Sequence, residues 1–218
     1  MENFSVNPKL ILFLLFIPIF LISIAIHEFS HTIIAYHLGD DTPKRSGRMT
    51  INPLKHLDII GSIIIPVAAF SSGVALIGWA KPVPINPENF SNRRLGDGLV
   101  SFAGPFSNFL LACLFLSILF ILPEIEIVNI SSRKIFLSDL LKYGIYINLF
   151  LAIFNLLPIP PLDGAHIIHT IFYNRLTEKW INLGFKGTII LLIFIYSPLW
   201  KYFNKILNSL LKFFLDML

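Results

Sequence analysis

Two classes of residue are scarce in this sequence, and each scarcity excludes a kind of protein. Cys113 is the only cysteine among 218 residues, which excludes both a disulfide framework and a metal site built from cysteines. Charged residues make up only 14% of the chain, whereas hydrophobic residues make up 55% and the mean hydropathy is +0.74. Such values lie far outside the range of soluble globular domains. We therefore expect an integral membrane protein.

The first apolar run, LILFLLFIPIFLISIAI, ends at residue 26 and carries no charge. With the helix continuing past His31, it is long enough to cross a hydrocarbon core of ~30 Å. A signal peptide would be followed by a cleavage site of small residues, and none follows here, so we expect a membrane span.

The net charge of +4 and the pI near 9.2 would suit a nucleic-acid partner. However, the Lys and Arg residues lie in the polar connections between apolar segments, where membrane topology places them. We expect a lipid bilayer as the surroundings and no nucleic-acid partner.

Hydropathy predicts an all-α polytopic membrane protein with about four to six transmembrane helices, folded as one domain over residues 1–218. Lys201, Lys205 and Lys212 recur near helical spacing, which is typical of an interfacial amphipathic end to a final span. The helices are expected up to Tyr36, over about 98–122 and 137–157, after Asp163, and from about 187 to the C-terminus.

The apolar segment 59–80 is ambiguous, because Pro66 and several Ser and Gly residues break a helix or allow a hairpin. A re-entrant segment is therefore an alternative to a full span. The stretch WAKPVPI that follows alternates and carries prolines. It predicts a small β element, an edge strand to which an unwound substrate adds, or equally a solvated surface loop.

The strongest chemical signal is the pattern HExxH over residues 27–31. On a helix, a step of four residues places His27 and His31 on one face, where both imidazoles can hold the same Zn²⁺. Glu28 lies about 100° round the helix, where its carboxylate can take a proton from a metal-bound water and deliver it to the leaving amine. The alternative is a set of buried side chains satisfied by neighbouring helices, which is disfavoured because ionisable groups within a span are costly.

Two histidines leave a catalytic zinc one protein ligand short. The best candidate is Asp163, because the prolines of NLLPIPPLD unwind the chain and could fix its carboxylate in the interior. An Asp would serve equally well as the N-cap of a helix that begins GAHIIHTIF, and the residues alone leave both readings open. The rival ligands are His166, His169, His37 and His56.

Three asparagines in the expected spans carry amides that must find partners in lipid. Asn108 follows a Gly-Pro pair near the start of a span, where helix packing explains it at least as well as a role in the site. Asn148 and Asn155 lie seven residues apart on one face of the next span. They are candidates for orienting the turn at Asp163 or for holding substrate backbone.

Five stretches occur in an order that is far more specific than HExxH alone. They are HEFSH at 27–31, GDDTPKRSGRMTINPLKHLDIIGSIIIP at 39–66, GWAKPVPINP at 78–87, AGPFSN at 103–108 and NLFLAIFNLLPIPPLDG at 148–164. Over about residues 20–175 the chain thereby resembles the site-2-protease family of intramembrane zinc metalloproteases, in its small bacterial form without PDZ or CBS domains. Ala165 stands where a second glycine often follows in that family.

This resemblance implies that His27, His31 and Asp163 bind one Zn²⁺ per chain and that Glu28 is the catalytic base. It also implies that the substrates are transmembrane or signal-peptide-like segments of other proteins. The alternatives to such a protease are a membrane metal transporter or channel, and an inactive homologue that acts as an adaptor.

A shared metal also constrains topology. His31 lies toward the C-terminal end of its span, and Asp163 follows the C-terminal end of another, so these two spans must run the same way to share a metal. The 98–122 helix connects into the second of them through one loop and must run the opposite way. The segment 59–80 must then enter and leave on one side. Seven Lys and Arg residues between 44 and 94 fall on that side, against Arg133 and Lys134 on the other. The positive-inside rule then predicts a multi-pass protein of the cell membrane with the zinc nearer the cytoplasmic face and the N-terminus outside.

Overall fold

The computed structural model describes residues 8–65, 67–68, 81–121 and 131–217, and within them it contains helices and no strand. The elements are α1 (Pro8–His37), α2 (Thr42–Arg45), η1 (Pro53–Lys55), η2 (Ile59–Ile64), η3 (Pro87–Asn89), α4 (Arg93–Ile121), α5 (Ser131–Asn155), α6 (Asp163–Phe172), α7 (Arg175–Ile181), α8 (Phe185–Tyr196) and α9 (Leu199–Leu215). The all-α fold class is confirmed. The expected β element is not seen in its described part, 81–85, and the rest of it lies outside the described residues.

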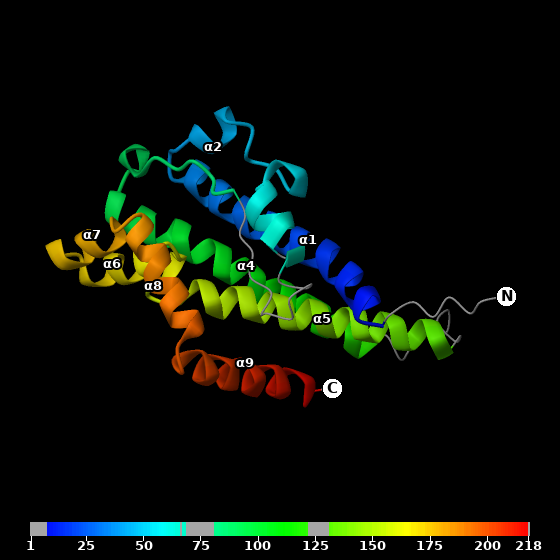
Figure 1. The fold of residues 1–218 in the computed structure, drawn as a ribbon. Helices are drawn as coiled ribbons and strands as arrows, with labels where there is room; N and C mark the ends of the chain where they lie inside the picture. Colours follow the sequence, from blue (N-terminus) through cyan, green and yellow to red (C-terminus); the bar gives the residue numbers. More distant parts are fainter. Residues whose placement is uncertain (1–7, 66, 69–80, 122–130, 218) are drawn as a thin grey trace.

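Three long helices, α1, α4 and α5, pack side by side and form the centre of the molecule (Figure 1). Helix α1 and helix α5 run the same way along the bundle, and α4 runs the opposite way. In the described part of the chain these three are long and apolar enough to cross a membrane, at Ile17–His37, Arg93–Ile121 and Leu137–Asn155. Among these described residues a fourth span is counted if α7 and α8, which are bent by 81°, form one span. Three or four candidate spans fit an all-α polytopic membrane protein.

Helix α4 begins five residues before the start that hydropathy indicates. The side chain of Asn92 accepts a hydrogen bond from the Leu95 amide at 3.1 Å, and its carbonyl accepts one from Gly96 at 2.7 Å. This N-terminal turn is polar, so a hydropathy profile does not include it, although its capping asparagine is a recognisable helix-start signal.

The outward face of α4 is apolar, as a lipid environment requires. Its inner face buries small side chains such as Ala112 against Ile145 and Leu149 of α5. Small residues let helices approach closely in a membrane, where packing rather than burial from water drives association. The exposed side chains of α4 include Leu99, Phe102, Phe106, Phe109, Leu110 and Leu114.

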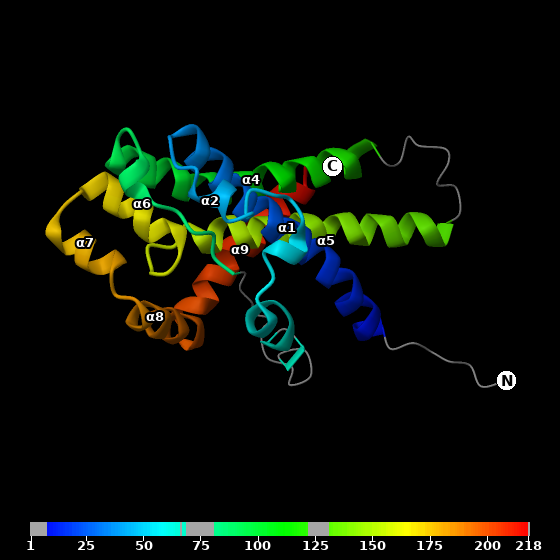
Figure 2. The same cartoon turned by 90° about the horizontal axis from the view of Figure 1, so that it is seen from above.

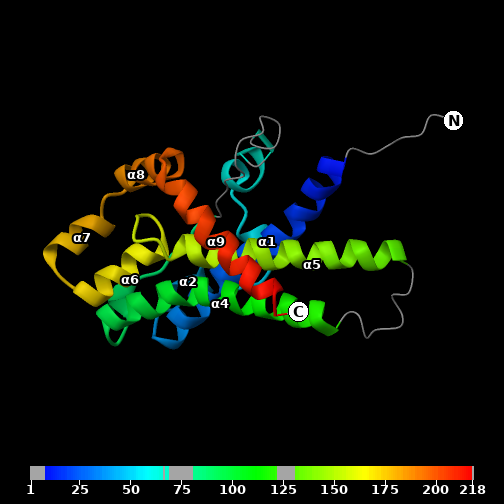
Figure 3. The same cartoon turned by 90° about the horizontal axis from the view of Figure 1, so that it is seen from below.

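The C-terminal apolar stretch is not one span, which differs from the sequence-based expectation. It is divided between α8, of 12 residues, and α9. Ser197 is extended, with φ −85° and ψ 163°, because the following Pro198 disfavours a helical conformation before it. Helix α9 crosses α5 obliquely on the side opposite α2 (Figures 1 and 3). Phe203 and Leu207 are buried in this contact, while the three lysines of α9 stay exposed.

The polar connection after α1 is fixed by a buried carboxylate, that of Asp40. It accepts hydrogen bonds from Thr42, from the Asn86 amide at 2.8 Å and from the Asn89 side chain at 2.8 Å. Burial raises the pKa of the Asp40 carboxyl, but these hydrogen bonds outweigh burial and hold that pKa below its ordinary value. The charged carboxylate therefore ties the end of α1 to the chain that leads into α4.

A second buried charge, Arg48, closes the ends of the segment 57–80. Its guanidinium donates to the carbonyl oxygens of Lys55, Lys81 and Pro82. The Lys81 amide also donates to the His56 carbonyl at 2.9 Å. The residues that flank this segment, 55–56 and 81–82, are thus held together, and η2 projects from the bundle beside them (Figure 2). Most of the predicted re-entrant path, residues 66 and 69–80, lies outside the described residues.

Candidate metal centre

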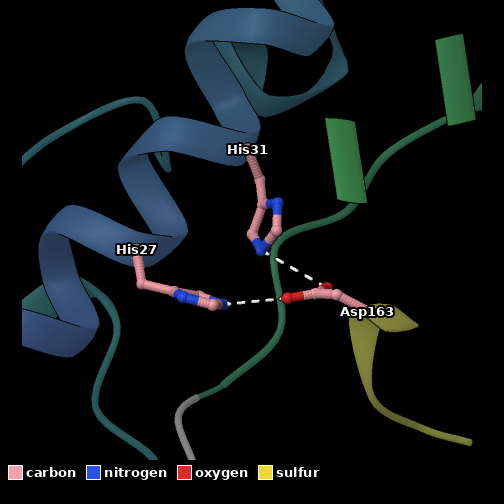
Figure 4. Close-up of side chains that lie close together, drawn as sticks. All are labelled: His27, His31 and Asp163. Carbon is pink, nitrogen blue, oxygen red and sulfur yellow. Dashed lines mark ion pairs between the residues drawn. The ribbon is translucent and has the colours of Figure 1, made fainter. Parts of the chain in front are cut away.

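Three side chains from two helices converge in the interior of the bundle (Figure 4). His27 and His31 extend from α1, and Asp163 reaches them from the first turn of α6. His27 Nε2 lies 3.2 Å from Asp163 Oδ2, and His31 Nε2 lies 3.5 Å from Asp163 Oδ1. Among the residues that the structure describes, this is the one group of three or more metal-ligating side chains close enough to share an ion.

The turn between α5 and α6 brings the carboxylate to this place. After Asn155 the proline-rich residues reverse the chain, and Trp180 holds the turn by donating to the Pro158 carbonyl at 2.9 Å. A Cβ on Gly164 would lie 2.3 Å from the Leu156 carbonyl oxygen, so only glycine allows α6 to start this close to the end of α5. The Asp-Gly pair therefore combines a candidate ligand with the residue that permits its position.

Asp163 does not use its carboxylate as a helix cap. Leu162 occupies the N-cap position of α6, and no side chain caps that helix. Asp163 Oδ2 is buried without a hydrogen-bond partner. An orphaned buried carboxylate oxygen is costly, and a cation held between it and the imidazoles would remove that cost.

The rival histidines are engaged elsewhere. His166 Nδ1 lies 3.0 Å from Asp97, and His169 Nδ1 lies 2.8 Å from Thr177 Oγ1. Burial lowers the pKa of His166, but Asp97 outweighs burial and raises that pKa above its ordinary value. His56 Nε2 pairs with the Thr50 carbonyl, and His37 stacks edge-on with the Tyr36 ring.

The outer nitrogens of both candidate ligands meet oxygen acceptors. His27 Nδ1 lies 2.6 Å from Asn108 Oδ1, and His31 Nδ1 lies 2.7 Å from the Val100 carbonyl oxygen. Amide and carbonyl oxygens only accept, so each Nδ1 carries a proton and donates it. In a neutral imidazole the Nε2 atom then presents a lone pair toward Asp163. Three electron-pair donors that face one another are stabilised by a cation between them.

Gly104 of α4 leaves the space that such an ion needs. A Cβ at this position would lie 2.5 Å from His31 Nε2 and 2.6 Å from His27 Nε2. Zinc binds imidazole nitrogen at ~2.0–2.1 Å, so the hydrogen of glycine keeps open the region toward which both nitrogens point. The separations of 3.2 and 3.5 Å between the imidazole nitrogens and the Asp163 oxygens also match the edges of a tetrahedral zinc site, roughly 3.3–3.5 Å from the same bond lengths.

Glu28 stands apart from the ligand group. It is half-buried on α1, next to His27 and three residues before His31. It lies close to the site without belonging to the converging set of ligand atoms.

The three asparagines divide into two kinds. Asn108 and Asn148 are fully buried and bonded to each other at 2.9 Å, and Asn108 reaches His27 directly. Asn155 instead donates to the carbonyl of Leu151 on its own helix at 2.9 Å.

Sequence reasoning missed two contributors to this arrangement. Ser23 bonds to both buried asparagines, and a signal existed, because it precedes His27 by four residues on the same helix face. Val100 contributes through its backbone carbonyl, which no side-chain pattern can reveal.

Comparison with known proteins gives consistent matches. The model of "Peptidase family M50" matches residues 15–195. "Putative zinc metalloprotease YwhC" of Bacillus subtilis is 36% identical over 219 residues, covering 98% of this chain and 96% of the relative. "Putative zinc metalloprotease Rip2" of Mycolicibacterium smegmatis is 31% identical over 186 residues, covering 83% and 67%. The Rip2 protein of Mycobacterium tuberculosis H37Rv is 30% identical over 153 residues, covering 70% and 55%. No solved structure gives a significant match.

Proposed function

Because the chain belongs to peptidase family M50, the site-2 protease family, we propose that it is a zinc metalloprotease that cuts peptide bonds in or beside transmembrane segments of other proteins. The observation that carries the proposal is the convergence of His27, His31 and Asp163 beside Gly104, inside a bundle of apolar helices. Substrates of this kind reach such a site through lipid, and exposed apolar side chains on α4 face that environment.

His27 and His31 would hold the zinc through Nε2, and Asp163 through its carboxylate, leaving a fourth position for water. When bound, the ion would polarise the scissile carbonyl and lower the pKa of its water toward ~7. The negative charge of Asp163 balances part of the charge of the ion in the low-dielectric interior. The hydrogen bonds at both Nδ1 atoms fix the rings with their lone pairs inward.

Glu28 would act as general base and then as general acid. Its carboxylate accepts a proton from the attacking water and passes it to the nitrogen of the leaving amine. Its position beside His31, outside the ligand set, suits a group that must stay free to exchange a proton.

The direction of the helices supports a topology in which the site lies nearer the cytoplasmic face. Helices α1 and α5 run the same way, so α1 ends at the end of the bundle where α5 leads toward α6 (Figure 1). The chain on that side, from 39 to 58 and from 81 to 94, carries seven Lys and Arg residues, against Arg133 and Lys134 in the connection on the other side. We include residues 1–218 in one membrane-embedded domain, because α1, α4, α5 and α6 all border the site.

Cleavage in proteoliposomes tests this function. The purified protein is mixed with a single-span substrate that carries a label at each end, and the products are mapped by mass spectrometry. We expect a cut in or next to the span that a chelator abolishes and Zn²⁺ restores. Cleavage that persists under chelation would contradict the proposal, and zinc flux into the vesicles without any cleavage would favour a metal transporter instead.

A further inference from the structure

A chain of buried hydrogen bonds connects the proposed zinc ligand His27 to helix α5. His27 meets Asn108 Oδ1 at 2.6 Å, and Asn108 Nδ2 donates to Asn148 Oδ1 at 2.9 Å. Asn148 Nδ2 in turn donates to the Gly144 carbonyl and to Ser23 Oγ, both at 2.9 Å. Asn108 and Asn148 are 0% exposed, so water does not compete for these bonds.

The direction of every bond in this chain is set by backbone carbonyls. The Gly144 oxygen can only accept, so Asn148 must turn its NH₂ toward it and leave its Oδ1 for Asn108. Asn108 also donates to the Ser23 carbonyl at 3.2 Å, which fixes its NH₂ a second time. Asn108 Oδ1 therefore faces His27, and an oxygen that only accepts keeps the imidazole proton on Nδ1.

We propose that Asn108 and Asn148 are positioning residues that hold His27 in the tautomer whose Nε2 lone pair faces the zinc. The inference rests on the proposed function, because it concerns the same metal site. The Asn108 amide contacts the ligand directly. Asn148 acts through Asn108, and Ser23 and Gly144 anchor the two amides.

The geometry predicts effects of different size at the two positions. Loss of the Asn108 amide leaves the His27 Nδ1 proton buried without an acceptor, so the ring no longer prefers one tautomer. Loss of the Asn148 amide removes one of two anchors of Asn108 and leaves the bond to the Ser23 carbonyl. A change at Asn148 should therefore weaken zinc binding less than a change at Asn108.

The test measures the zinc dissociation constant of the full-length protein in detergent by competition with a chelator. We expect Asn108→Leu to weaken zinc binding by about 10- to 100-fold, as loss of a ligand's hydrogen-bond partner does elsewhere. Asn108→Gln, which keeps both the accepting oxygen and the donating NH₂ on a side chain one methylene longer, should lose less affinity than Asn108→Leu. The absorption spectrum of bound Co²⁺ should change more in Asn108→Leu than in Asn108→Gln.

Substitutions of Asn148 test the same proposal if Asn108→Leu does not fold. Asn148→Gln keeps both an acceptor for the Asn108 NH₂ and a donor for the Gly144 carbonyl, and it should bind zinc more tightly than Asn148→Leu. The matched control is Asn204→Leu, since Asn204 donates to its own-helix carbonyl at Trp200, also at 2.9 Å, far from the metal ligands in sequence. Its zinc affinity should equal that of wild type.

The outcomes separate this inference from the proposed function. If the wild-type protein bound no zinc, the proposed metal site would be wrong. If wild type bound zinc and Asn108→Leu bound it equally tightly, the positioning role would be refuted. It would be refuted as well if Asn108→Gln were as weak as Asn108→Leu, because the amide would then not be what His27 requires.

Discussion

Replacing Gly104 with alanine is the smallest change that should fill the proposed zinc position. The new Cβ would lie 2.5 Å from His31 Nε2, whereas uncompressed contacts between heavy atoms are about 3.5 Å or more. The rings cannot retreat freely, because their Nδ1 atoms are held at 2.6 Å from Asn108 and 2.7 Å from Val100. Helix α4 or both rings must shift by about 1 Å to accept the methyl group.

The expected size of the effect follows from that overlap. Overpacking of a close-packed interior costs about 1–3 kcal/mol. Since every 1.4 kcal/mol is a factor of ten in a binding constant, Gly104→Ala should weaken zinc binding by about 5- to 150-fold if the strain falls on the bound state. The measurement is the zinc dissociation constant in detergent, together with the thermal unfolding of the chelator-treated protein.

Gly96→Ala is the matched control for steric strain. It lies on the same helix, and its Cβ would lie equally close, at 2.5 Å, to the Phe90 ring. It should lower thermal stability while leaving zinc affinity unchanged. If Gly104→Ala bound zinc as tightly as wild type, or if Gly96→Ala weakened zinc binding as much, the reasoning about the zinc position would be refuted.

The remaining predictions concern the third ligand, the polar connection and the topology. Asp163→Asn removes the charge that balances the ion and should weaken zinc binding by at least about tenfold, whereas His166→Ala should leave zinc binding unchanged. Full zinc binding by Asp163→Asn together with loss of zinc binding by His166→Ala would show that His166, not Asp163, is the third ligand. Asp40 has a lowered pKa, so its contribution to stability is present above the ordinary value near ~4 and lost as pH falls below it. The difference in melting temperature between wild type and Asp40→Asn should therefore shrink on acidification from pH ~7 to ~3, and a constant difference would argue against it. Single cysteines at Ser46 and Ser91, in a chain whose native cysteine is replaced by serine, should be labelled from the same side of the membrane; labelling from opposite sides would show that 59–80 crosses it.

The sequence predicts the group of side chains that the structure brings together, because their pattern is local or strongly marked. The four-residue spacing places His27 and His31 on one face of their helix, however that helix packs in the fold. Asp163 was open between ligand and helix cap, because both uses place an Asp at the start of a helix. Only the fold, which turns its carboxylate toward α1, distinguishes them.

Other features depend on tertiary contacts that residue type does not record. The lysines of α9 suggested the end of a final span, but Pro198 begins a separate helix whose apolar face packs on α4 and α5. The acceptor for His31 is the backbone of Val100, and the second anchor of Asn108 is the backbone of Ser23. Every residue carries such a carbonyl, so the fold alone selects the ones that are used.

The most direct test of the account is a paired measurement on Glu28→Gln, of zinc content per chain and of cleavage of a single-span substrate. Glutamine cannot accept the proton of the attacking water, but it leaves all three metal ligands in place. We predict one zinc per chain, as in wild type, with nearly all proteolysis lost. A Glu28→Gln protein that cut its substrate at the wild-type rate, or that lost its zinc, would contradict the assignment of Glu28 as the base beside the metal.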